Sequence, residues 1–329
     1  VRVSMEAGGA HQKRCEGKNG AETVQGIVKT ANGTDFAYLT AGECLELLQN
    51  KIKASSEEVE LLQLRDEILV PESFSVQKSE EEVYQKLQKK FGDKGLTHHQ
   101  RIELTRGYKN TSEEELFEGA SALAKWNLEI GYKIVDTKIT TEDENFGHCM
   151  PESFHGTDKF GHPVTFMRLS ELKLKDIRKH FKKPSNVTKP FSRMLGSIKM
   201  IKEALSSHLG YKIRKHIVIA DLKGLSMMSF ARNKAYARAL SQVPYLFFPD
   251  HVYRIYIVNP TKIFNMLWAV VRKWVDPSTL DFIVKLNSAE ESLRIWKEHG
   301  IPQEAIPVSM GGKSKGIPII DLARMIAPK

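Results

Sequence analysis

The residue patterns that most often carry chemistry are incomplete in this chain. Gly311-Gly312-Lys313-Ser314 ends like a phosphate-binding loop, whose backbone N–H groups surround phosphate oxygens. That loop needs another glycine five residues before Gly312, and Pro307 stands there. Gly224-Leu225-Ser226 begins like the turn that presents a nucleophilic serine, but Met228 replaces the second glycine that permits the sharp bend. The sequence therefore argues against nucleotide binding and serine hydrolysis.

Metal and redox chemistry also lack support. His98 and His99 are adjacent, so they point in different directions on a helix, and no HExxH pattern accompanies them. No GxGxxG follows an expected strand. The three cysteines, Cys15, Cys44 and Cys149, are odd in number and without CxxC spacing, which favours a reducing, cytoplasmic compartment over a disulfide framework. We expect a protein that is not an enzyme and that needs no metal or cofactor.

The chain is basic, with a formal net charge of +9 and a pI near 9.2. Such a balance indicates an acidic partner, either nucleic acid or an anionic membrane surface. Eight Lys or Arg residues lie between Lys173 and Arg193 against the single acid Asp176. We expect a basic, membrane-facing surface here, or alternatively an ordinary solvated face. Because no aromatic stacking platform accompanies the charges, we expect no nucleic acid. The membrane-facing cations on the first reading are Lys179, Lys182 and Lys183.

A helical region precedes the second half of the chain. Residues 1–40 have little apolar periodicity and are expected to be a flexible segment. Residues 41–150 are expected to be helical, with a capping box at Ser79 and Glu82 opening a helix that ends near Gly92. Ser112 precedes three acids that favour a helix start. One face of that helix is expected to carry Leu116, Ala120, Leu123, Trp126 and Ile130.

Short apolar runs alternate with helical segments after residue 150. The runs of strand length are Val164–Met167, Ile217–Ala220, Ile255–Val258 and Phe282–Leu286. The helical segments between them are roughly Phe191–Leu209, Ser229–Gln242 and Thr261–Trp274. Strands that alternate with helices predict an α/β fold with a mostly parallel sheet and flanking helices. The smaller all-helical region precedes this domain.

Several blocks in order resemble the CRAL-TRIO lipid-binding domain family, in particular its yeast-type phosphatidylinositol transfer proteins. The blocks are Asp158 to Val164, Asp221 to Ser226, Phe247 to Asp250, Ile257 to Asn259, Asp276 to Thr279 and Gly311-Gly312. A looser match at Thr105 to Asn110 is similar to the family's N-terminal helical module, which would span about 96–135. The resemblance assigns residues 151–312 to the lipid-binding domain and leaves 313–329 as a C-terminal tail.

The resemblance implies a hydrophobic cavity above the sheet, closed by a mobile gate at Pro260–Pro277. The gate carries too many apolar residues for one buried stripe, so one side would touch lipid. An ordinary buried crossover helix is the alternative. The apolar gate residues are Phe264, Met266, Leu267, Trp268, Val270, Val271 and Trp274. Lys262, Arg272 and Lys273 would reach toward anionic headgroups.

The family's headgroup residues carry over only in part. Of its inositol-phosphate set, the chain keeps Lys109 and Thr279, but Tyr108 and Phe282 replace cations and Asp250 replaces a Glu. Of its choline set, His216 and Val218 replace hydroxyl residues, and Phe248 replaces a Tyr. Tyr245 is also expected among the lipid-binding residues. Because unsatisfied polar atoms cost roughly 1–3 kcal/mol each, these changes favour a more apolar or differently headed ligand.

Three hypotheses follow for the function. The first is a carrier or presenter of a phospholipid at membranes, acting as a cytoplasmic, peripheral and monomeric protein. The second is a carrier of a sterol, retinoid, carotenoid or tocopherol-like molecule. The third is a membrane-sensing scaffold or signalling adaptor whose residues 1–95 bind a protein.

Overall fold

The computed structural model describes residues 23–24, 27–28, 38–53, 75–92, 95–260, 268, 272, 280 and 282–328. The chain divides into two compact units, residues 1–37 and 38–329. Within the first unit, strands β1 (Thr23–Val24) and β2 (Ile27–Val28) pair antiparallel. Most of the segment expected to be flexible, residues 1–40, lies outside the described residues.

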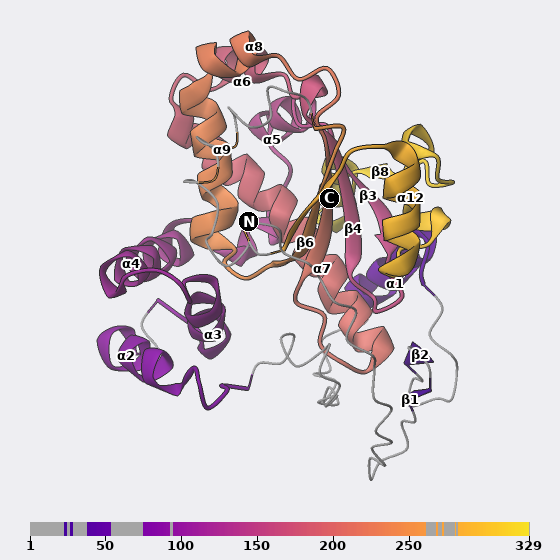
Figure 1. The fold of residues 1–329 in the computed structure, drawn as a ribbon. Helices are drawn as coiled ribbons and strands as arrows, with labels where there is room; N and C mark the ends of the chain where they lie inside the picture. The colour runs from indigo at the N-terminus through magenta and orange to yellow at the C-terminus, as the bar shows by residue number, and fades with distance from the viewer. Residues whose placement is uncertain are drawn as a thin grey trace, which may run out of the picture. The chain divides into compact units, whose positions relative to one another are not determined.

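Helices open the second unit, as the sequence predicts. They are α1 (Ala41–Lys53), α2 (Glu81–Phe91), α3 (His98–Gly107), α4 (Glu113–Glu129), the 3-10 turn η2 (Tyr132–Asp136) and α5 (Thr141–Gly147). In Figure 1, α2, α3 and α4 form a purple group in which neighbouring helices pack together. The N-terminal helical region is confirmed.

Local capping explains where these helices begin. The Ser112 hydroxyl accepts from the Glu115 N–H while the Glu115 carboxylate accepts from the Ser112 N–H, so two orphan donors at the start of α4 are satisfied. The capping box expected at Ser79 and Glu82 is wrong. The N-cap of α2 is Glu80, one residue later than expected, and no side chain caps the helix there. The Glu80 carboxylate instead accepts a hydrogen bond from the Gln77 N–H.

A six-stranded mixed sheet forms the centre of the second unit. Its strands are β3 (Glu152–Thr157), β4 (Pro163–Arg168), β5 (His216–Asp221), β6 (Val252–Val258), β7 (Ile283–Leu286) and β8 (Ile317–Pro318). The order is β7-β6-β5-β4-β3-β8, with parallel pairs from β4 to β7 and antiparallel pairs at β3. The mostly parallel α/β fold is confirmed. Strand β3 was not predicted because Phe154 is its only large apolar residue, and β8 was not predicted because it has only two residues.

The connections on the strand path are η3 (Leu169–Glu171), α6 (Leu174–His180), η4 (Pro184–Val187), α7 (Thr188–Leu209), α8 (Met227–Arg232) and α9 (Lys234–Phe247). The segment expected to be helical over roughly Ser229–Gln242 is helical, but it is divided at Asn233 into α8 and α9, and α9 continues to Phe247. The helix expected at Thr261–Trp274 lies almost wholly outside the described residues.

The sheet carries a different environment on each face. One face packs Val164, Ile217 and Ile219 against the fully buried Trp296 of α12 (Ala289–Glu298). Figure 1 shows α12 and α9 on opposite sides of the strands. The 3-10 turns η5 (Gln303–Ala305) and η6 (Val308–Met310) follow α12.

Residues 313–328 are folded onto this unit. Strand β8 pairs with β3, and the buried apolar face of α13 (Ile319–Ile326) contacts α5 and α7. The segment that the sequence set apart as a C-terminal tail therefore contributes an edge strand and a buried helix.

Candidate functional site

The face of the sheet away from Trp296 presents an apolar floor. Side chains alternate along a strand, so Val218 and Ala220 of β5 lie opposite Ile217 and Ile219. The parallel register sets Val218 beside Ile255 of β6, and Ile255 beside Ile283 of β7. All of the floor residues Val218, Ala220, Ile255 and Ile283 are only partly buried, in contrast to the sealed opposite face.

Trp268 packs on this floor. It joins the partly buried side chains that surround the cluster of Leu222 and Ile257. Trp268 and the exposed Arg272 are the described members of the expected gate. The predicted gate residues Phe264, Met266, Leu267, Val270, Val271, Lys273 and Trp274 lie outside the described residues, as does Thr279. The contact made by Trp268 is the one expected of a segment that covers the floor.

One carboxylate fastens the carboxyl ends of three strands beside the gate segment. Asp221 at the end of β5 accepts from Arg168 Nε at 2.8 Å and from Asn259 Nδ2 at 2.8 Å. Burial of Asp221 opposes its ionisation, but the hydrogen bonds from Asn259 and Arg168 outweigh it and lower the pKa of the carboxyl. The arrangement brings together Asp221 and Asn259, which belong to two separate blocks of the family resemblance.

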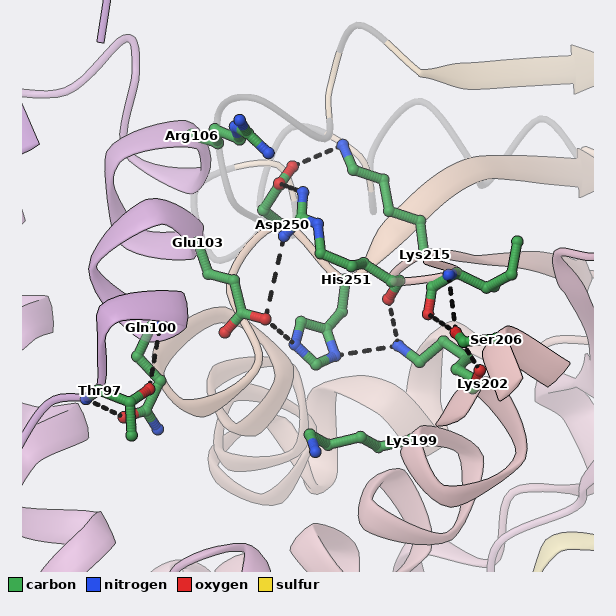
Figure 2. A network of polar contacts seen from close by, with 12 residues as sticks. Thr97, Gln100, Glu103, Arg106, Lys199, Lys202, Ser206, Lys215, Asp250 and His251 are labelled. Carbon is green, nitrogen blue, oxygen red and sulfur yellow. Dashed lines mark hydrogen bonds and ion pairs between the residues drawn. The ribbon is translucent and has the colours of Figure 1, made fainter. Parts of the chain in front are cut away.

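The amino ends of β5 and β6 hold a larger buried network, drawn in Figure 2. Asp250 Oδ2 accepts from Arg214 Nη2 at 2.7 Å, and Asp250 Oδ1 lies 2.6 Å from Lys215 Nζ. All three residues are buried. Asp250 has a φ of 58°, a left-handed conformation that Asp tolerates better than most residues. Its two oxygens are thus already engaged by cations of the chain itself.

Glu103 of α3 extends this network into the helical module. Lys202 Nζ lies 3.1 Å from His251 Nδ1, and His251 Nε2 lies 3.2 Å from Glu103 Oε1 (Figure 2). Because an ammonium only donates, Nδ1 accepts and the ring proton sits on Nε2, where it donates to Glu103. Burial, reinforced by Lys202 and Arg214, lowers the pKa of His251 well below its ordinary value. Burial raises the pKa of Glu103, although the positive charges of Arg214, Lys199 and Lys202 oppose that shift.

The expected headgroup residues of the helical module lie in two environments. Tyr108 is buried and stacks on Tyr245 of α9, with ring centroids 5.2 Å apart. Lys109 is exposed. Phe248 is buried among Trp126, Tyr132 and His251 in edge-on ring contacts. The geometry therefore gives Tyr108, Tyr245 and Phe248 packing contacts between α9 and the helical module, and leaves their ligand contacts a prediction.

His216 and Val218 lie on the floor side of β5. Burial lowers the pKa of His216 well below its ordinary value, so the ring is neutral. Among the described residues, His216 Nδ1 has no hydrogen-bond partner. Phe282, where the resemblance expects a lysine, is 40% exposed, and the centroid of its ring lies 5.7 Å from Lys215 Nζ. Arg214 and Lys215 were not among the predicted site residues, although they belong to a basic run directly before β5 that could have indicated them.

Most cations of the basic stretch are exposed, and their contact with membranes stays a prediction. Lys179, Lys182 and Lys183 are all exposed on and after α6. Arg193, counted in the same basic stretch, is buried and pairs with Asp143 at 3.1 Å. Its inclusion in a surface patch was wrong, because α7 turns that position into the core.

No group of three or more metal-ligating side chains occurs within the part of the chain that the structure describes. The same residues contain no helix long and apolar enough to cross a membrane. Cys44 and Cys149 are buried and free, and burial raises the pKa of both thiols, which makes them weak nucleophiles.

The CRAL/TRIO domain family model matches residues 148–312, half of the chain, which include strands β3 to β7 and the clusters around Asp221 and Asp250. The chain belongs to the CRAL/TRIO domain family. The resemblance drawn from the sequence blocks is thereby confirmed. This is a lipid-binding and lipid-transfer family rather than a family of enzymes.

Similar curated proteins include SEC14 cytosolic factors and a lipid transfer protein. The chain is 26% identical over 203 residues to the SEC14 cytosolic factor of Candida glabrata, covering 61% of this chain and 65% of that protein. It is 24% identical over 198 residues to the phosphatidylinositol/phosphatidylcholine transfer protein SFH7 of Arabidopsis thaliana, covering 58% of this chain and 35% of that protein. The chain thus spans less than two thirds of the length of the curated relatives it matches.

A solved structure is also similar. The crystal structure of Sfh5 superposes with a TM-score of 0.44 at 15% identity, covering 74% of this chain and 93% of that chain.

Proposed function

We propose that this protein binds a phospholipid on the floor formed by β5, β6 and β7 and transfers it between membranes or presents it at one. The observation that carries the proposal is Trp268 packed over a half-buried apolar floor within a CRAL/TRIO domain. Each buried CH₂ contributes ~0.8 kcal/mol to the free energy of binding, so acyl chains that replace water on such a surface bind favourably.

The polar groups beside the floor support a non-standard headgroup site. His216 Nδ1 is a buried ring nitrogen without a partner among the described residues, and it is open to one hydrogen bond from a ligand. Asp250 is held by Arg214 and Lys215, so it contributes little free negative charge. Lys109 and Thr279 remain the candidate phosphate contacts on the inositol side.

A carrier of a sterol, retinoid, carotenoid or tocopherol-like molecule is the second candidate. The replacement of hydroxyls by Val218 and Phe248 favours it, because a ligand with few polar atoms leaves fewer of them unsatisfied on such a surface. This candidate predicts near-ultraviolet or visible absorbance of the purified protein that a phospholipid carrier lacks.

Mass spectrometry of organic extracts from the purified protein tests the proposal. We expect phospholipid in near-stoichiometric amount, together with transfer between labelled donor and acceptor vesicles. A protein that yields neither a lipid nor transfer contradicts the whole proposal, whereas a sterol or isoprenoid in the extract selects the second candidate.

Two sets of variants locate the membrane-facing parts. Trp268→Asp is expected to slow ligand exchange, since a charge replaces an apolar contact of the gate segment. Lys182→Glu with Lys183→Glu is expected to weaken binding to anionic vesicles. That result would support peripheral association of the cytoplasmic protein with membranes. Unaltered exchange and vesicle binding in both would refute the membrane-facing assignment.

The proposed protein partner of residues 1–95 needs a separate test. Deletion of those residues is expected to abolish any interaction that the adaptor hypothesis requires. The adaptor hypothesis is dropped when all interactions survive the deletion.

A further inference from the structure

A groove of about 670 Å³ lies between α9 and the start of α7, apart from the sheet floor. One wall is Pro184 and Ser185 of η4 with Thr188 of α7. The other wall is a single face of α9, with lining residues Lys234, Ala235, Arg238, Ala239, Gln242, Val243, Leu246 and Phe247. The volume lies in the range of roughly 300–1,000 Å³ that small-molecule sites occupy.

Positive charge lines one wall of the groove and lies next to the other. No Asp or Glu occurs from Ile177 to Lys202 or from Met227 to Pro249. Lys234 and Arg238 line the groove and are exposed, and the exposed Lys182 and Lys183 directly precede Pro184. No ion pair is recorded for any of these four cations within the described residues. The groove therefore favours an anionic occupant.

Charge and apolar surface are separated along the length of the groove. The cations Lys234 and Arg238 occupy the amino end of α9, and Val243, Leu246 and Phe247 occupy its carboxyl end. Ala235 and Ala239 also line the groove, and their small side chains fill little of it. Leu246 lies twelve positions after Lys234 on the helix, a rise of ~18 Å. An occupant that matches this surface is anionic at one end and apolar at the other.

The shape of the groove selects among anionic partners. A bilayer surface touches protruding residues and would leave a recessed floor such as Val243 uncovered. An acidic helix would need cations along the whole length, whereas the lining of the carboxyl half contains none. A single-chain amphiphile satisfies both halves, with its head at Arg238 and its chain along Ala239 and Leu246.

We propose that the groove between η4 and α9 is a second binding site, for a single-chain anionic amphiphile such as an alkyl phosphate or a lysophospholipid. The site is distinct from the sheet floor of the proposed lipid carrier. It gives the protein a place to hold a charged lipid fragment while the floor is occupied.

Titration calorimetry with dodecyl phosphate below its micelle threshold tests the proposal on the full chain. Inorganic phosphate supplies the head alone, and dodecyl maltoside supplies the chain with a neutral head. We expect each to bind at least about tenfold more weakly than dodecyl phosphate, since each fills half of the site. Equal binding of dodecyl maltoside overturns the anionic assignment, and equal binding of inorganic phosphate overturns the apolar one.

Arg238→Glu and Ala239→Trp are the decisive variants. The first reverses an exposed charge and the second fills the middle of the groove without changing charge, so the two act by different means. Both are expected to reduce dodecyl phosphate affinity about tenfold or more. Lys297→Glu, an exposed charge reversal on α12, is the matched control and is expected to leave affinity unchanged. Matching circular dichroism melts verify folding.

A diazirine in the dodecyl chain separates this site from the sheet floor. Photolabelled peptides are expected from 184–189 and 235–247, and vesicle-to-vesicle transfer is expected to survive in Arg238→Glu. Labelling confined to β5 and β6, or an affinity that both variants leave intact, overturns the second site without touching the proposed carrier function. Displacement of the probe by an acidic amphipathic peptide that binds more tightly also overturns it, in favour of a protein partner.

Discussion

The amino and carboxyl ends of β5 and β6 are held by opposite means. At the amino ends, a buried network of two carboxylates, three cations and a neutral histidine reaches from the sheet into α3 and α7. At the carboxyl ends, one carboxylate, Asp221, serves three strands. The difference indicates that the helical module is fixed firmly to the lipid-binding domain, while the edge that leads into the gate segment is fastened lightly.

A second contrast lies within the carboxyl edge itself. Glu152 opens β3 and pairs in register with Met167, one residue before Arg168. Burial raises the pKa of Glu152 to about 7, although a hydrogen bond with Thr165 opposes the shift, whereas the pKa of Asp221 is lowered. The hydrogen bonds from Asn259 and Arg168 therefore keep Asp221 charged at neutral pH, whereas burial favours the neutral form of Glu152.

The largest expected effect is at the amino ends. Asp250→Asn keeps the size of the side chain and its tolerance of a positive φ, but it leaves Arg214 and Lys215 without their carboxylate. Breaking a buried pair in this way is expected to lower the free energy of unfolding by about 3–5 kcal/mol. Urea denaturation measures it, with the exposed Asp136→Asn as control. A loss no greater than that of the control would show that the network is not what holds this end.

Glu152→Gln is expected to stabilise the protein at alkaline pH. Because the folded pKa of about 7 lies above the unfolded value, the wild type loses stability as pH rises from about 4.5 through 7. The variant does not, so the gap between them should grow to about 3 kcal/mol by pH 8. Denaturation curves at pH 4, 6 and 8 check the sign, and a gap that does not change with pH contradicts a buried carboxyl.

Asp221→Asn is expected to have a smaller cost of about 1–3 kcal/mol, because two donors lose a charged acceptor. The lowered folded pKa of Asp221 means that its contribution is present above the unfolded pKa and disappears as pH falls through the folded one. The wild type and the variant should therefore converge in strong acid. Divergence there would indicate that Asp221 acts by shape alone.

The smallest effect is expected at the rim of the amino-end network. The Ser206 hydroxyl donates to the Lys202 carbonyl and accepts from the Ile213 N–H at 2.8 Å. Ser206→Ala is expected to cost about 1 kcal/mol, since Lys202 and Arg214 keep their charged contacts. A cost equal to that of Asp250→Asn would show that the network fails as one unit wherever it is broken.

The sequence predicted the parts that local patterns determine. Val164–Met167 and Ile255–Val258 are mainly apolar runs, and a buried parallel strand needs little more. β3 contains Glu152, Ser153 and His155, so its pattern does not separate it from a loop. It becomes a strand because β4 and β8 pair with it from both sides.

The candidate site depended more on tertiary structure than the fold did. Glu103 and His251 are 148 positions apart, and neither residue type marks a pair across such a distance. Phe248 has the spacing of a ligand residue, yet it is buried among aromatic rings of the helical module. The family blocks indicate where a ligand is held, while individual contacts depend on packing that a single sequence does not show.

The bond between Asp221 and Asn259 also sets where mechanical force enters the domain. Tension applied to the chain at Pro260 would pass through Asn259 into the ends of β4, β5 and β6 together, through a single side chain. A force that a membrane exerts on the chain at that point would thus be shared by the ends of three strands instead of acting on β6 alone.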